Sequence, residues 1–100
     1  MDDFKHLTEA MHDFVTRKGW YAPNSKRPQT PRNLAISLVL EASEILEHFQ
    51  WGEECADKAA LADELADVML YLLQLASLHD IDLYQAARNK LARNLKREWE

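Results

Sequence analysis

Residues 31–50 read PRNLAISLVLEASEILEHFQ, and this stretch decides the fold. Its apolar residues recur at helical spacing and surround most of the circumference of a helix from about Pro31 to Gln50. Thr30 is a good N-cap, and Pro31 suits the first helical position. A helix that is apolar on nearly all sides is typically buried. Because a chain of 100 residues has difficulty covering such a helix, we expect the protein to form oligomers.

Helical patterns also dominate the rest of the chain. Three further helices are predicted, over about Asp3 to Lys18, Lys58 to His79 and Asp82 to Trp99. Gly19 is a natural stop for the first helix, and Asp82 with Gln85 forms a capping box at the start of the last. All three prolines lie in residues 23–31, so the segment from Trp20 to Arg32 is predicted to be a long loop. We therefore expect an all-α fold, a compact four-helix bundle that forms a single domain over residues 1–100.

Composition excludes several classes of function. The formal net charge of −5 argues against binding a nucleic-acid polymer, which requires a basic surface. No stretch approaches the roughly 20 apolar residues that span a bilayer, so we expect no membrane partner. The first residues are acidic and do not resemble a secretory signal. The single cysteine, Cys55, excludes an intramolecular disulfide and fits a reducing compartment, so a cytoplasmic location is expected.

Two pairs of acidic residues interrupt the apolar surfaces of the two central helices. Glu41 and Glu44 form one pair, and Glu64 and Asp67 form the other. Residues spaced i, i+3 lie on one helical face, with Cβ atoms about 5–6 Å apart. If the two helices pack antiparallel, as their short link requires, the pairs can face each other. Four partly buried carboxylates would repel one another, and a divalent cation that prefers oxygen ligands, Mg²⁺ or Mn²⁺, would remove that conflict.

The alternative is that these acids are ordinary surface residues or ion-pair partners. Between Pro31 and Leu78, however, the only lysine or arginine residues are Arg32 and Lys58, so few ion-pair partners are at hand. A di-iron site would require Glu-x-x-His pairs, and neither of the two central helices carries one. Zinc would require histidine and cysteine ligands, and these are scattered along the chain. His48 is therefore interpreted as a polar residue at a helix end.

The two motifs, Glu41-x-x-Glu44 and Glu64-x-x-Asp67 with about twenty residues between them, resemble the signature of the all-α nucleotide pyrophosphohydrolases. The surrounding sequence is more similar to the MazG-like and dCTP pyrophosphatase branch of that superfamily. The similar segments are residues 31–34 (PRNL), residues 49–51 (FQW), Asp67-Val68-x-x-Tyr71, and Lys90, Asn94 and Arg97 near the end. The resemblance covers nearly the whole chain.

The resemblance implies cleavage between the α- and β-phosphates of a nucleoside triphosphate, giving the monophosphate and pyrophosphate. It assigns Mg²⁺ binding to the four acids and makes Glu47 the candidate for orienting the attacking water. It implies that Lys90, Asn94 and Arg97 bind phosphates and that Trp20, Trp51 and Tyr71 hold the base. Relatives carry a histidine where Met11 stands, and His12 lies one position away, which leaves a base contact by His12 open. Some of these residues also have ordinary structural interpretations: a surface acid for Glu47, a core residue for Trp51, and a cation at a helix end for Arg97.

The sequence leaves more than one function open. The resemblance favours dCTP or a related deoxynucleoside triphosphate and a role in controlling the nucleotide pool. The same metal site could instead serve dUTP or phosphoribosyl-ATP. The alternative that is not an enzyme is a helical interaction module without catalytic activity. On that interpretation we expect that Mg²⁺ does not stabilise the protein. The resemblance also implies a homodimer or a dimer of dimers, with sites near the subunit interfaces.

Overall fold

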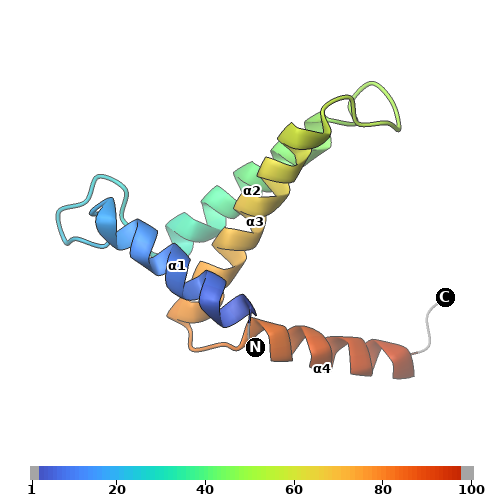
Figure 1. Ribbon diagram of the computed structural model, residues 1–100. Coiled ribbons are helices and arrows are strands. Elements are labelled where there is room, and N and C mark those ends of the chain that lie inside the picture. The colour runs from blue at the N-terminus through green and yellow to red at the C-terminus, as the bar shows by residue number, and fades with distance from the viewer. Residues whose placement is uncertain (1–2, 98–100) are drawn as a thin grey trace.

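Four helices account for most of the computed structural model, which describes residues 3–97 (Figure 1). They are α1 (Asp3–Arg17), α2 (Pro31–Glu47), α3 (Lys58–Leu78) and α4 (Leu83–Lys96). The described residues contain no strand, so the predicted all-α fold is confirmed. None of the helices within residues 3–97 combines the length and the apolar character needed to cross a membrane.

The antiparallel pair of α2 and α3 forms a long hairpin, and α1 lies across its base (Figure 1). The core sits where the start of α2, the end of α3 and α1 meet. Its buried apolar residues are Met11, Val15, Leu34, Leu73 and Ala76. The loop at the far end of the hairpin, residues 48–57, is well separated from this core (Figure 1). One end of the hairpin is therefore packed and the other is open.

Side-chain caps set the first residue of three helices, as N-cap chemistry predicts. Thr30 Oγ1 accepts a hydrogen bond of 3.2 Å from the Asn33 amide, so Pro31 begins α2 as expected. Asp57 caps α3 in the same way at 3.0 Å, and Asp82 caps α4 at 3.0 Å. The reciprocal half of the predicted capping box does not form, because the Gln85 amide donates to Asn89 Oδ1 instead.

The helix ends differ from the predictions by small amounts. Gly19, with φ of +74°, lies just after α1 and confirms the predicted stop, since a glycine adopts this left-handed conformation without strain. The second helix ends at Glu47 rather than Gln50, and residues 48–51 form turns. The last helix ends at Lys96 in the described chain, and the predicted end at Trp99 lies outside the described residues.

The fourth helix does not fold back onto the other three (Figure 1). It leaves the base of the hairpin as an arm, and its apolar residues Leu91 and Leu95 are 61% and 88% exposed. Along α2, Val39 and Leu46 are also largely exposed. The expected compact bundle is thus reached by three helices only. Several apolar residues that the sequence pattern predicts to be buried are therefore exposed in the single protomer.

Candidate active site

The four acidic residues of the two motifs, two on α2 and two on α3, lie close enough for their charges to interact. Burial raises the pKa of the Glu41 carboxyl, and the charges of Glu44, Asp67 and Glu64 together with a hydrogen bond to Glu44 raise it further. The negative charges of the other three acids thus act on the Glu41 carboxyl, so the four acids form one electrostatic cluster. In residues 3–97 no lysine or arginine forms an ion pair with any of them. No lysine or arginine among the described residues therefore offsets the repulsion.

The chemistry of this donor set fits a hard divalent cation. All four side chains offer carboxylate oxygens, which Mg²⁺ and Mn²⁺ prefer, and a cation would relieve the repulsion that raises the pKa of Glu41. The described side chains do not already surround a metal position, because no three of the His, Cys, Asp and Glu residues converge as a ready set of ligands. Small rotations of exposed carboxylates would therefore have to accompany cation binding.

His48 is a neighbour of the acidic cluster whose contacts the sequence did not reveal. Its Nε2 forms a hydrogen bond with Oε2 of Glu64 across the α2–α3 hairpin, and its Nδ1 lies 3.6 Å from the Cys55 thiol sulfur. Both side chains of the His48–Glu64 pair are partly buried. His48 is the C-cap residue of α2, so its predicted place at the helix end is confirmed. The hydrogen bond was not predictable, because it depends on how the two helices are aligned.

Glu47 lies beside the acidic cluster. Together with Glu44, His48 and Glu64 it lines a shallow pocket of about 310 Å³. Its carboxylate is therefore placed next to two of the predicted metal ligands, on the exposed side of the hairpin. This position is compatible with the water-orienting role that the resemblance implies.

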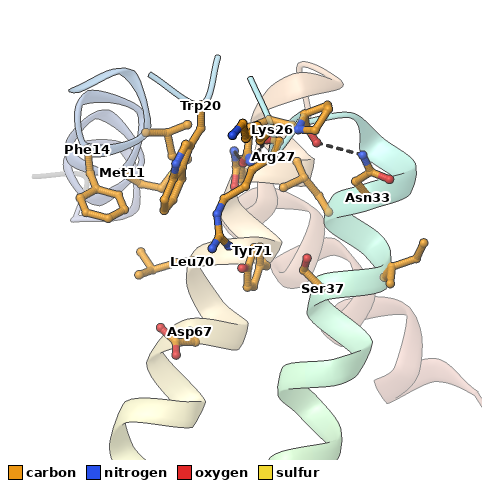
Figure 2. Close-up of a pocket in the computed structure, with 16 residues that line it drawn as sticks. Met11, Phe14, Trp20, Lys26, Arg27, Asn33, Ser37, Asp67, Leu70 and Tyr71 are labelled. Atoms are coloured by element: carbon orange, nitrogen blue, oxygen red, sulfur yellow. Dashed lines mark hydrogen bonds between the residues drawn. The ribbon is translucent and has the colours of Figure 1, made fainter. Parts of the chain in front are cut away.

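A second, deeper pocket of about 420 Å³ lies at the base of the hairpin, between α1, α2, α3 and the proline-rich loop (Figure 2). Trp20 and Tyr71, which the resemblance assigns to the base, both line it. Asn33 and Ser37 contribute polar groups from α2. Asp67 belongs both to this pocket and to the acidic cluster. The pocket and the carboxylates are thus neighbouring parts of one site.

A chain of hydrogen bonds supports the floor of this pocket. Gln74, which is 3% exposed, donates from Nε2 to the Tyr21 hydroxyl at 3.1 Å and to Gln29 Oε1 at 2.9 Å. The Tyr21 hydroxyl lies 2.6 Å from His12 Nδ1, and His12 Nε2 lies 2.7 Å from Ser77 Oγ. Both ring nitrogens of His12 are occupied by these contacts. His12 therefore joins α1, the loop and α3, and it is not among the residues that line the pocket.

Trp20 is held between an aromatic ring and a cation. Phe14 packs against it edge to face, with ring centroids 5.6 Å apart. Arg27, from the same proline-rich loop as Trp20, places its guanidinium carbon 5.6 Å from the Trp20 ring centroid. Arg27 and Lys26 both line the pocket and were missed by the sequence analysis. Their only signal in the sequence was their place on a long loop beside a tryptophan.

The remaining predicted substrate residues lie elsewhere in the protomer. Trp51 is 91% exposed in the loop at the far end of the α2–α3 hairpin, and Lys90, Asn94 and Arg97 lie on or just after α4. None of these four lines the deeper pocket. The structure therefore divides the predicted set: Trp20 and Tyr71 meet at the pocket, beside the acids, and the others do not reach it within one chain.

Comparison with known proteins decides the family. The model of the MazG-like family matches residues 36–100, which include both acidic motifs and α4. The chain belongs to the MazG-like family. This result confirms the resemblance on which the sequence analysis relied.

The MazG-like chain is also similar to curated proteins named dCTP pyrophosphatase 1. It is 34% identical to the Mus musculus protein and 35% identical to the Bos taurus protein, each over 94 residues. The matches cover 85% of this chain, 52% of the mouse protein and 53% of the bovine protein. The chain therefore spans about half the length of the curated relatives it matches.

A solved structure confirms the fold of this MazG-like chain. A pyrophosphatase from Archaeoglobus fulgidus superposes with a TM-score of 0.83 at 28% sequence identity. The match covers 100% of this chain and 95% of the archaeal one. The extended arrangement, with α4 projecting from the hairpin, is thus closely similar to that of a known pyrophosphatase.

Proposed function

We propose that this MazG-like protein hydrolyses a deoxynucleoside triphosphate, dCTP in particular, to the monophosphate and pyrophosphate. The observation that carries the proposal is the continuity of the site: Asp67 borders the aromatic pocket and belongs to the acidic cluster. A nucleotide whose base lies between Trp20 and Tyr71 would extend its phosphates toward the carboxylates. The dCTP pyrophosphatase 1 relatives favour cytosine as the base.

The acidic cluster is proposed to hold Mg²⁺, with Mn²⁺ as a substitute. Glu41, Glu44, Glu64 and Asp67 would be the ligands, and the raised pKa of Glu41 supports a cation there. A bound ion supplies charge neutralisation for the phosphates and lowers the pKa of a coordinated water. His48 would hold Glu64 in position through its Nε2 hydrogen bond. Glu47, on the rim beside Glu44 and Glu64, would accept a hydrogen bond from the attacking water and orient it.

The remaining parts of the chain bind and shield the substrate. Trp20 and Tyr71 offer aromatic faces on which any base can stack, so base identity must come from polar groups such as Asn33 and Ser37. The Gln74–Tyr21 hydrogen bond fixes the loop that carries Trp20. This arrangement keeps the pocket wall in place before the nucleotide arrives.

We further propose that the protein is a homodimer or a dimer of dimers. Apolar residues that one protomer leaves exposed support this assembly: Val39 (64%), Leu40 (61%) and Leu46 (72%) on α2, and Leu91 and Leu95 on α4. Exposed apolar area of this extent typically marks an interface. Assembly would also allow Trp51, Lys90, Asn94 and Arg97 to reach a site formed with another protomer. Such an enzyme would control the free nucleotide pool, and a cytoplasmic location fits this role.

Hydrolysis of the four deoxynucleoside triphosphates and dUTP, with and without Mg²⁺, tests the proposal. Pyrophosphate and orthophosphate must be measured separately, because only pyrophosphate release reports cleavage between the α- and β-phosphates. We expect Mg²⁺-dependent pyrophosphate release that is fastest with dCTP. Release that is fastest with dUTP would support the proposed cleavage but would show that uracil, and not cytosine, is the preferred base. No release from any of the five would contradict the proposed activity.

A further inference from the structure

The proline-rich loop places a cation on the wall of the pocket. Arg27 lies over the Trp20 ring at 5.6 Å. Figure 2 shows its side chain running from the loop alongside Trp20, with the guanidinium directed toward Leu70 and Tyr71 of α3. This is the side of the pocket that Asp67 borders. The cation therefore lies between the aromatic part of the site and the carboxylates.

Hydrogen bonds on both sides of Arg27 fix its backbone. The Arg27 amide donates to Ser25 Oγ at 3.0 Å, and its carbonyl accepts from Gln29 Nε2 at 2.7 Å. Gln29 Oε1 in turn accepts from the buried Gln74 amide of α3 at 2.9 Å. The loop at Arg27 is thus tied to a core residue of the hairpin. The position of the guanidinium is set by the fold as well as by its contact with Trp20.

The charge of Arg27 is not neutralised by an acidic side chain. Among residues 3–97, no aspartate or glutamate forms an ion pair with it. A guanidinium over the face of an aromatic ring still has several N–H donors available for other partners. These donors form a fork that matches two oxygens of a phosphate. In a chain with a formal net charge of −5, a cation kept beside a pocket in this way points to an anionic ligand.

We infer that Arg27 is a further substrate-binding residue, whose guanidinium, held against Trp20, binds phosphate oxygens of the nucleotide in the pocket. This inference rests on the proposed function and adds to it a residue that neither acidic motif contains. The contact with Trp20 keeps the guanidinium at the pocket before the nucleotide binds. The phosphate chain would then meet a cation on the loop side and the acidic cluster on the hairpin side.

Binding of dCMP and deoxycytidine to Arg27→Gln, measured by calorimetry in the presence of Mg²⁺, tests the inference. We expect the Kd of dCMP to rise by about ten- to hundredfold, the effect of losing charge-assisted hydrogen bonds. The Kd of deoxycytidine, which has no phosphate, should change by less than about twofold on the same reasoning. Arg27→Lys keeps the charge without the planar fork, and it should recover part of the affinity for dCMP.

Arg17→Gln is the matched control. Arg17 forms an exposed ion pair with Asp13 at 3.0 Å and does not line the pocket, so its loss removes the same charge without a change in either Kd. An equal loss of affinity for deoxycytidine and dCMP in Arg27→Gln would overturn the phosphate contact in favour of a base contact. Unchanged affinity for both would overturn any contact.

Hydrolysis of dCTP by the same variants separates this inference from the proposed function. If the unmodified protein hydrolyses dCTP and Arg27→Gln has the same KM, only the inference about Arg27 fails. If the unmodified protein neither hydrolyses dCTP nor binds dCMP, the proposed function fails and the inference fails with it. We expect the KM for dCTP to rise in Arg27→Gln and to be unchanged in Arg17→Gln.

Discussion

His48 Nε2 and Glu64 Oε2 are joined by a hydrogen bond across the α2–α3 hairpin. The Cys55 thiol lies 3.6 Å from the other ring nitrogen and can donate to it, which leaves Nε2 as the nitrogen that carries the proton in a neutral imidazole. In this tautomer His48 donates to a proposed metal ligand and fixes the orientation of its carboxylate. Outer partners of this kind commonly set the affinity of metal sites.

His48→Ala should weaken Mg²⁺ binding by about ten- to hundredfold, because Glu64 loses the partner that orients it. Mg²⁺ titration followed by calorimetry measures this effect. The control is His6→Ala, since His6 is exposed on α1 and lines neither pocket of the site. Equal Mg²⁺ affinity in His48→Ala and the unmodified protein would show that the hydrogen bond does not organise the site.

Glu64→Gln and Asp67→Asn should each lower Mg²⁺-dependent turnover by at least about a hundredfold, because each removes a proposed ligand charge. Both side chains lie outside the core, so circular dichroism should show an unchanged helical fold. Asp63→Asn is a matched control on the same helix, since Asp63 is exposed and lines none of the pockets at the site. Activity retained in either of the two ligand variants would contradict the metal assignment.

Glu41→Gln should stabilise the metal-free protein at neutral pH by up to about 1 kcal/mol, which corresponds to a rise of several degrees in Tm. The pKa of Glu41 is raised in the folded state, so folding favours its protonated form. This contribution to stability is present below the unfolded-state pKa and is lost as pH rises through the folded-state value. The gain should therefore vanish in acid.

Thermal unfolding of Glu41→Gln and the unmodified protein in EDTA, at neutral and at acidic pH, tests whether the variant is more stable at neutral pH and equally stable in acid. Added Mg²⁺ should raise the Tm of the unmodified protein more than that of the variant, because ligand binding stabilises only the state that binds it. A variant less stable than the unmodified protein in EDTA at neutral pH would contradict the repulsion that we assign to the acidic cluster.

Tyr21→Phe should destabilise the fold by about 1–3 kcal/mol, since it leaves Gln74 Nε2 and His12 Nδ1 each without one hydrogen-bond partner. Urea denaturation measures the change. Tyr84→Phe is the control, because it removes the same atom from a ring that is 52% exposed. Similar small effects of the two substitutions would show that the chain of hydrogen bonds under the pocket adds little to stability.

Replacing Leu91 and Leu95 together by lysine should reduce the oligomer to a smaller species, because both side chains are largely exposed in one protomer. Helices α1 to α3 should stay folded, since α4 packs little against them. Sedimentation equilibrium of the variant and the unmodified protein measures the mass. A monomeric unmodified protein, or an unchanged mass in the variant, would contradict an interface on α4.

Local chemistry made most of the fold predictable. The caps at Thr30 and Asp82, and the stop at Gly19, involve residues within a few positions of one another, so the sequence contains the whole interaction. The early end of α2 at Glu47 was not predictable, because the apolar pattern continues through Phe49 while the chain turns toward the hairpin loop. Only the tertiary arrangement decides such an end.

The candidate site, like the fold, was predictable from the sequence only in part. Helical spacing alone placed each pair of acids on one face, and the hairpin then brought the pairs into one electrostatic environment. The contacts of His48 with Glu64 and of Arg27 with Trp20 depend on helix alignment and loop conformation, which no spacing rule supplies. The direction of α4, and with it the place of Lys90, depends on contacts between helices, which spacing along one helix does not specify.

In the proposed oligomer, the arm formed by α4 would link folding to association. It has only 14 residues, and a helix of this length is marginal in water when it lacks tertiary support. The Asp82 cap and the Gln85–Asn89 hydrogen bond join residues of α4 and its N-cap. They help the first turns of the helix to form, but they do not attach it to the other helices. Its full helicity would then be gained in the same event that joins two chains. Dilution would partly unwind this end of the molecule while the α2–α3 hairpin stays intact, so helical content itself would depend on protein concentration.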